Sequence, residues 1–134
     1  MTEANKRANL ADELGRSADS FRAADALVAL DLPRDAISRT YYVIFHLVEA
    51  LLFSRGLQAR THAGVFHVFR VEFIQTAIFD ETHNAFLSNL QKLREVADYK
   101  SNVVISIDTA RDQLALARAF EKLVRDWLAA NGWI

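Results

Sequence analysis

The sequence predicts an all-α fold, a single up-and-down bundle of about five helices that occupies residues 1–134. Helix breakers are scarce, with one proline and four glycines in 134 residues, whereas Ala, Leu and Arg are abundant. Apolar residues recur at intervals of three and four, the spacing of one helix face. The breaks fall where Pro, Gly, Asn and Asp cluster, and they divide the chain into five segments. The length is that of one domain.

The first two helices are predicted from about Lys6 to Leu30 and from Pro33 to Arg55. Pro33 suits the first position of a helix, where its missing N–H costs nothing, and Gly56 suits a left-handed C-terminal cap. The second helix is apolar around most of its circumference, so we expect it at the centre of the bundle. The predicted core stripes are Leu10, Leu14, Ser17, Phe21, Ala24 and Val28 in the first helix, and Ile37, Tyr41, Ile44, Val48 and Leu51 in the second.

The third helix is predicted to begin at Thr61, as its N-cap, and the fourth to run from about Ala85 to Lys100 after a turn at Asp80–Asn84. Ser101–Ser106 reads as an extended connector packed across the bundle, and the last helix starts near Asp108 and ends at Asn131–Gly132. The predicted core residues are Val65, Phe66, Phe69, Phe73 and Ala77 in the third helix, Phe86, Leu90, Leu93 and Ala97 in the fourth, and Leu116, Phe120, Leu123 and Trp127 in the last.

Composition excludes several classes of protein. There is no cysteine, so a disulfide scaffold, a thiol nucleophile and a cysteine-ligated metal are excluded. The four histidines lack metal-ligand spacing and no glycine-rich nucleotide-binding motif occurs, so we expect neither a metal nor a cofactor. The formal net charge of -1 excludes non-specific coating of a phosphate backbone but leaves room for a local arginine site.

No targeting signal is visible. Met1 to Ala11 is polar, and the apolar run Tyr41–Phe53 is interrupted by His46 and Glu49 and is too short to span a bilayer. We therefore expect a cytoplasmic protein without membrane contact.

Polar residues inside the apolar second helix are the first candidate site. Arg39, Tyr42, His46 and Glu49 follow one another at steps of three and four and share one stripe. Arg39 and His46 are seven residues apart, about 10 Å along the axis, so both side chains can lean toward one phosphate. The alternative interpretation is a packed histidine with an arginine–glutamate pair beside it.

Two further clusters carry the same kind of side chain. Thr61 and His62, flanked by further arginines, stand at a helix start that favours an anion, although simple capping explains them equally well. Arg94, Asp98 and Tyr99 lie at the end of the fourth helix, where an intrahelical ion pair and a packed tyrosine are the alternative.

Three separated motifs resemble those of one family. They are Ala36–His46 followed by Gly56-Leu57, the segment Thr61-His62-Ala63-Gly64-Val65, and Leu93-Arg94 with Ala97-Asp98-Tyr99. Their order and spacing resemble HEPN-domain proteins, in particular the small stand-alone bacterial and archaeal branch. The resemblance covers about Leu10 to Lys100.

The resemblance implies a helical bundle that is frequently a dimer and is often encoded beside a minimal nucleotidyltransferase in a toxin–antitoxin-like pair. Active members are metal-independent endoribonucleases that use an Arg and a His separated by four to six residues on the penultimate helix. In this chain Tyr99 stands where that His would follow Arg94. The same spacing joins Arg39 to His46, the best of three such pairs because both lie on one helix face.

These observations lead to three hypotheses. The first is a non-catalytic or weakly catalytic module that binds a nucleotide, RNA or a nucleotidyltransferase partner in a toxin–antitoxin or stress-type system. The second is a metal-independent endoribonuclease that uses Arg39 and His46, with Tyr42 or Glu49 orienting them. The third is a dimeric scaffold. The first predicts a groove between the second and fourth helices that collects Arg39, His46, Arg94 and Tyr99. A homodimer is expected because Trp127, Trp133 and Ile134 add apolar surface near the chain end.

Overall fold

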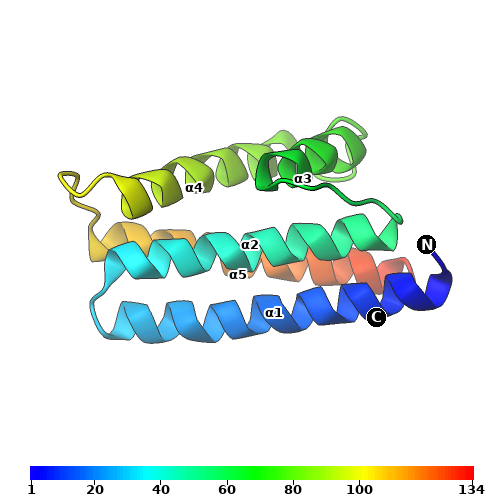
Figure 1. The fold of residues 1–134 in the computed structure, drawn as a ribbon, viewed down its shortest axis with the longest axis horizontal. Helices are drawn as coiled ribbons and strands as arrows, with labels where there is room; N and C mark the ends of the chain where they lie inside the picture. The colour runs from blue at the N-terminus through cyan, green and yellow to red at the C-terminus, as the bar shows by residue number, and fades with distance from the viewer.

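The computed structural model describes residues 1–134 and is all-α, as predicted. Its elements in chain order are α1 (Glu3–Ala29), α2 (Pro33–Ser54), α3 (His62–Phe69), the π-helical segment η1 (Arg70–Ile74), α4 (Glu81–Tyr99) and α5 (Ile107–Ala130). Figure 1 shows α1, α2 and α5 side by side along the long axis, with α4 above α2 and the shorter α3 near the end where both termini lie. The structure therefore confirms a helical bundle.

The helix ends follow from local chemistry. The side chains of Thr2, Thr61 and Ser106 each accept a hydrogen bond from the backbone N–H three residues on, at 3.1, 2.9 and 3.1 Å. Pro33 occupies the first turn of α2, and Gly56 follows that helix with φ of 69°. The predicted signals at Pro33, Gly56 and Thr61 are confirmed, and Thr2 and Ser106 are two further caps that were not predicted.

Helix α2 lies at the centre of the bundle and packs against α1, α3, α4 and α5. Its predicted stripe, Ile37, Tyr41, Ile44, Val48 and Leu51, is buried throughout. Ser17 of α1 is fully buried and donates a hydrogen bond of 3.0 Å to the carbonyl of Val43, which joins α1 to α2. The site residues on α2 therefore lie on a helix that is packed against four other helices.

The segment after α3 differs from the prediction. The α-helix gives way to η1 at Arg70, and Ala77 sits in the following turn, exposed and with φ of 60°, so its predicted burial is wrong. The prediction of a turn at Asp80–Asn84 is also wrong, because the residues after Asp80 are already helical. Asp80 accepts a hydrogen bond of 2.7 Å from the N–H of Thr82 and caps α4, so the helix begins at Glu81.

The connector and α5 correct two further predictions. Of the connector residues, Ile105 is buried, but Val104 is 92% exposed and does not pack on the bundle. Leu116 is 48% exposed, whereas its neighbour Ala117 is buried. The buried stripe of α5 includes two alanines and consists of Ala110, Gln113, Leu114, Ala117, Phe120, Val124 and Leu128.

The 22-residue helix α2 is long and apolar enough, by length and composition, to cross a membrane, unlike the shorter run Tyr41–Phe53 on which the prediction was based. Buried residues make up 61% of its most apolar window. Its position at the centre of the bundle accounts for that composition, because a core helix passes the same test.

Candidate functional site

Two arginines from different helices meet at one tyrosine of α2. The Arg39 guanidinium carbon lies 4.9 Å from the ring centroid of Tyr42, and that of Arg94, from α4, lies 5.7 Å from the same centroid. Arg94 also lies over the ring of Tyr41, at 4.7 Å, and donates a long hydrogen bond of 3.4 Å to the Tyr42 hydroxyl. The contacts of the two guanidinium groups with the tyrosine rings have cation–π geometry. Arg39 and Arg94, two of the four residues predicted to line a groove between the second and fourth helices, thus lie at the same tyrosine.

Arg94 is held firmly in this position. Its Nε lies 3.0 Å from an oxygen of Asp98, and the hydroxyl of Ser38 donates to the other oxygen of Asp98. Burial opposes its charge, but Tyr42, Tyr41 and Asp98 together raise the pKa of Arg94, so the guanidinium stays protonated. Arg39 is exposed and has no carboxylate partner in the chain. The pair therefore carries net positive charge.

His62 comes from the start of α3 and completes this cluster. Its Nδ1 lies 3.0 Å from the hydroxyl oxygen of Tyr41, and its ring centroid lies 4.2 Å from that of Phe45. Partial burial lowers the pKa of His62, and the positive charges of Arg94 and His46 lower it further. Burial raises the pKa of Tyr41 to about 12, so this hydroxyl keeps its proton at neutral pH.

His46 is paired with a residue that the sequence did not reveal as a candidate. Its Nδ1 lies 2.6 Å from Oε2 of Glu13 on α1, and the two side chains are only 15% and 12% exposed. Glu49, which with Tyr42 was a candidate for orienting His46, makes no hydrogen bond to it. Burial and the charge of Glu13 raise the pKa of Glu49, while His46 opposes that shift.

The remaining predicted residues lie at the edge of the cluster or outside it. Thr61 serves as the N-cap of α3, and its hydroxyl is occupied by the N–H of Gly64. Tyr99 ends α4 with 76% of its surface exposed, and its hydroxyl bonds to nothing within the chain. Arg55, one of the arginines that flank Thr61 and His62 in the sequence, packs over Phe73 and Trp127, at 5.3 and 5.7 Å from the ring centroids.

Sequence reasoning missed Glu13, Ser38, Tyr41 and Phe45 as members of the site. Tyr41 was assigned to the core because it falls on the buried stripe, and its ring is indeed buried, but its hydroxyl reaches His62. Glu13 stands three residues after Leu10 and immediately before Leu14, beside the core stripe. An acidic residue in that position was the available signal.

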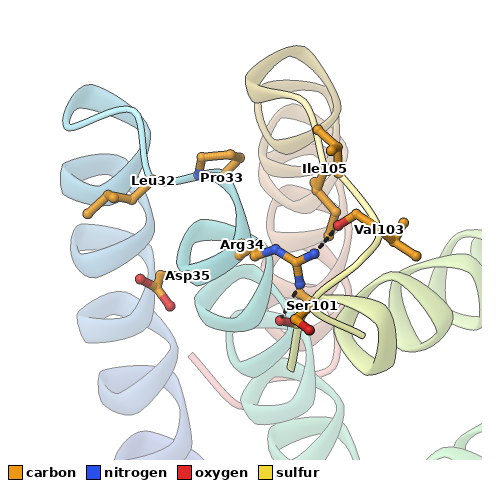
Figure 2. A pocket seen from close by; sticks show the side chains of 9 residues that line it. Leu32, Pro33, Arg34, Asp35, Ser101, Val103 and Ile105 are labelled. Carbon is orange, nitrogen blue, oxygen red and sulfur yellow. Dashed lines mark hydrogen bonds between the residues drawn. The ribbon is translucent and has the colours of Figure 1, made fainter. Parts of the chain in front are cut away.

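The structure has one cavity, of about 380 Å³, and it lies away from this cluster. Figure 2 shows it between the α1–α2 turn and the α4–α5 loop, with Arg34 pointing across it. Arg34 donates to the carbonyls of Val96, Ala97 and Lys100, at 3.1, 2.9 and 2.8 Å, and also to that of Val103. Its guanidinium is thereby occupied, so we place the site at the exposed cluster rather than in the cavity.

No group of three or more His, Asp or Glu side chains lies where it could hold a metal ion.

The sequence of this chain also resembles those of known proteins. The family model described as the HEPN domain matches residues 11–127. A protein of Methanocaldococcus jannaschii named "Putative toxin" is 34% identical over 84 residues, which are 63% of this chain and 63% of that protein. A UPF0332 protein of Thermotoga maritima is 32% identical over 95 residues, or 68% of this chain and 72% of its own. A second "Putative toxin" of M. jannaschii is 28% identical over 112 residues, covering 84% of this chain and 76% of that protein.

Proposed function

Because this chain belongs to the HEPN-domain family, we propose that it is a toxin-type HEPN module that binds the phosphodiester backbone of RNA, or a nucleotide phosphate, on the α2–α4 surface. The observation that carries this proposal is the meeting of Arg39 and Arg94 at the ring of Tyr42, at 4.9 and 5.7 Å. Guanidinium groups bind phosphate oxygens through two parallel hydrogen bonds, and aromatic side chains stack on bases. The names of two relatives support the toxin-type context.

The charge distribution supports a local site rather than general RNA coating. The whole chain carries a formal net charge of -1, whereas Arg39 lacks a carboxylate partner and Arg94 has one, Asp98. A phosphate placed between the two guanidiniums therefore meets an excess of positive charge. The affinity of such a site falls as salt increases, in proportion to the few phosphates it binds.

We place this module in a toxin–antitoxin or stress-type system, in the cytoplasm, with a nucleotidyltransferase-type protein as partner and a second copy of the chain as its dimer mate. The apolar surface that suggested a dimer is partly covered within the chain. Trp127 packs edge-on against Phe73, at 5.3 Å between ring centroids, and Arg7 lies 4.8 Å from the Trp133 ring. Sedimentation equilibrium tests the dimer, because it measures the molar mass in solution. The molar mass of a monomer at high protein concentration would refute the dimer.

Fluorescence anisotropy with a labelled mixed-sequence single-stranded RNA tests the binding site. We expect Arg39→Gln and Arg94→Gln each to weaken binding about tenfold and to reduce its salt dependence by about one phosphate. Arg22→Gln is the matched control, since Arg22 is an exposed arginine of α1 outside the cluster. Equal affinities in wild type and both site variants would refute the proposal.

The second candidate function is a metal-independent endoribonuclease, favoured by the contact of 2.6 Å between His46 and Glu13. A carboxylate on Nδ1 fixes the orientation of an imidazole, as in catalytic triads, and leaves Nε2 for proton transfer. Arg39 borders Tyr42 on the same helix and would stabilise the charge that develops on phosphorus. Incubation of total RNA with purified protein in chelator tests this function, because wild type should cleave and His46→Ala should not. If the RNA stays equally intact with wild type and with His46→Ala, the endoribonuclease function is rejected and only the binding function remains.

A further inference from the structure

We infer that His62 and His46 form a two-imidazole acid–base pair for cleavage of an RNA phosphodiester, with His62 as the base and His46 as the acid. This inference rests on the endoribonuclease candidate above and assigns residues to its two proton transfers. It differs from an Arg–His arrangement because a second histidine, from the start of α3, supplies one of the transfers.

The geometry places the two rings around one aromatic side chain. The ring centroid of Phe45 lies 4.2 Å from that of His62 and 5.5 Å from that of His46. The two imidazole centroids are therefore no farther apart than these distances together, which one phosphodiester linkage can span. Tyr42 lies 6.0 Å from His62 and 6.3 Å from His46, so the tyrosine that carries both guanidiniums also faces both histidines.

Each imidazole has one nitrogen occupied and the other available. Nδ1 of His46 lies at Glu13 and Nδ1 of His62 lies at the Tyr41 hydroxyl, while neither Nε2 has a hydrogen-bond partner in the chain. The base role of His62 uses the tautomer in which Nδ1–H donates to the Tyr41 oxygen and the Nε2 lone pair is free. A tautomer fixed by its second nitrogen is the usual requirement for such a base.

The electrostatic surroundings of the two rings are opposite. Glu13 of α1 contacts Nδ1 of His46, and Glu49 of α2 lies close enough to interact with the same ring. Arg94 of α4 faces His62, and burial, Arg94 and His46 all lower the pKa of His62. A carboxylate neighbour suits a group that gives a proton and a guanidinium neighbour suits one that takes it, so the two rings differ in the way that an acid and a base in one site require.

The cleavage step balances without a co-reactant. Nε2 of His62 takes the proton of the ribose 2′-hydroxyl as the 2′-oxygen attacks phosphorus and forms the new P–O2′ bond. The P–O5′ bond breaks, its electron pair leaves with the 5′-oxygen, and Nε2 of His46 gives that oxygen its proton. The products are a 2′,3′-cyclic phosphate and a 5′-hydroxyl end, and solvent then restores both histidines. Arg39 and Arg94 stabilise the charge on the non-bridging oxygens.

The test uses two synthetic oligonucleotides that span a linkage cleaved by the wild-type protein in a mixed-sequence transcript. One carries the natural 5′-oxygen at that linkage and the other carries a bridging 5′-sulfur, which leaves without needing a proton. We expect His46→Gln to slow cleavage of the oxygen substrate about 100-fold or more and to recover nearly wild-type rates on the sulfur substrate. We expect His62→Gln to be slow on both.

The pH profile provides a second measurement. The bell-shaped rate of the wild type should lose its acidic limb in His62→Gln and its alkaline limb in His46→Gln. Tyr41→Phe, which removes the partner of Nδ1, should slow both substrates by a smaller factor. His67→Gln is the matched control, since His67 is an exposed histidine of α3 outside the cluster. Thermal melting establishes that each variant is folded.

Three results separate the outcomes. Wild-type rates on the oxygen substrate in folded His62→Gln would overturn the assignment of the base, and recovery of His62→Gln rather than His46→Gln on the sulfur substrate would overturn the assignment of roles. Failure of the wild type to cleave any RNA in chelator would instead reject the endoribonuclease candidate and this inference with it.

Discussion

Glu13 and His46 join the first two helices through a contact of 2.6 Å between a carboxylate oxygen and an imidazole nitrogen, and both side chains are largely buried. The contact fixes one nitrogen of His46 from a helix that contributes no other site residue. Sequence spacing along α2 pointed to Tyr42 or Glu49 for this role, whereas Glu13 makes the contact in the structure.

Glu13→Gln tests the orienting role of this carboxylate. An amide can donate to Nδ1 and so favours the tautomer of His46 with its proton on Nε2. We expect RNA cleavage to fall by about 10²-fold while RNA affinity is unchanged, as measured by single-turnover kinetics and anisotropy. Glu3→Gln, at the exposed start of α1, should match the wild type. A parallel loss of affinity and rate would show that Glu13 supports the whole cluster rather than His46.

Glu49→Gln should change the pH dependence of stability. Burial and Glu13 raise the pKa of Glu49 in the folded state, so the fold favours its protonated form. That contribution is complete below the unfolded pKa and is lost as the pH rises through the folded pKa. The neutral variant should therefore be more stable than wild type at pH 7, and the difference should vanish in acid.

Urea denaturation at pH 4 and pH 7 measures this effect. Glu95→Gln, on the exposed face of α4, serves as the control and should show no comparable gain at pH 7. A Glu49→Gln protein that is less stable than wild type at neutral pH would contradict the prediction.

Thr61→Ala should destabilise the protein by about 1 kcal/mol, because the side chain caps α3 through the N–H of Gly64, at 2.9 Å. Thr61→Ser keeps the hydroxyl and should retain most of the stability. Both values follow from chemical denaturation. Since His62 is the first residue of α3, the alanine variant should also weaken any activity that depends on His62. Equal stability of the two variants would show that the cap contributes nothing measurable.

Ala77→Gly should be neutral or stabilising by up to about 1 kcal/mol, because Ala77 has φ of 60°, where glycine avoids the strain of a side chain. Ala85→Gly, at an exposed position inside α4, should destabilise by about 1 kcal/mol. The same substitution thus has opposite expected signs at two sites, and thermal melting compares them. Destabilisation at Ala77 as large as at Ala85 would contradict the strain argument.

Local signals predicted most of the fold and about half of the site. Pro33, Gly56 and Thr61 act on backbone within three residues of themselves, so the helix limits that depend on them could be predicted from the sequence. The stripe of Arg39, Tyr42 and His46 followed from helical periodicity in the same way.

The features that were missed depend on partners distant in the chain. The partner of His46 comes from α1 and that of Tyr41 from α3, and no spacing within α2 indicates either. The predicted stripe of the last helix ran through Leu116, Phe120, Leu123 and Trp127. The buried stripe is rotated by one residue at its start, so Ala117 is buried and Leu116 is 48% exposed.

The four carbonyls bound by Arg34 have a consequence for the order in which the fold closes during synthesis. Arg34 belongs to the first turn of α2 but attaches to the last turn of α4 and to the carbonyl of Val103. A chain that ends before Val96 lacks every one of these acceptors, so the start of α2 stays unattached to α4 until α4 is nearly complete. This end of the bundle therefore closes only late in translation.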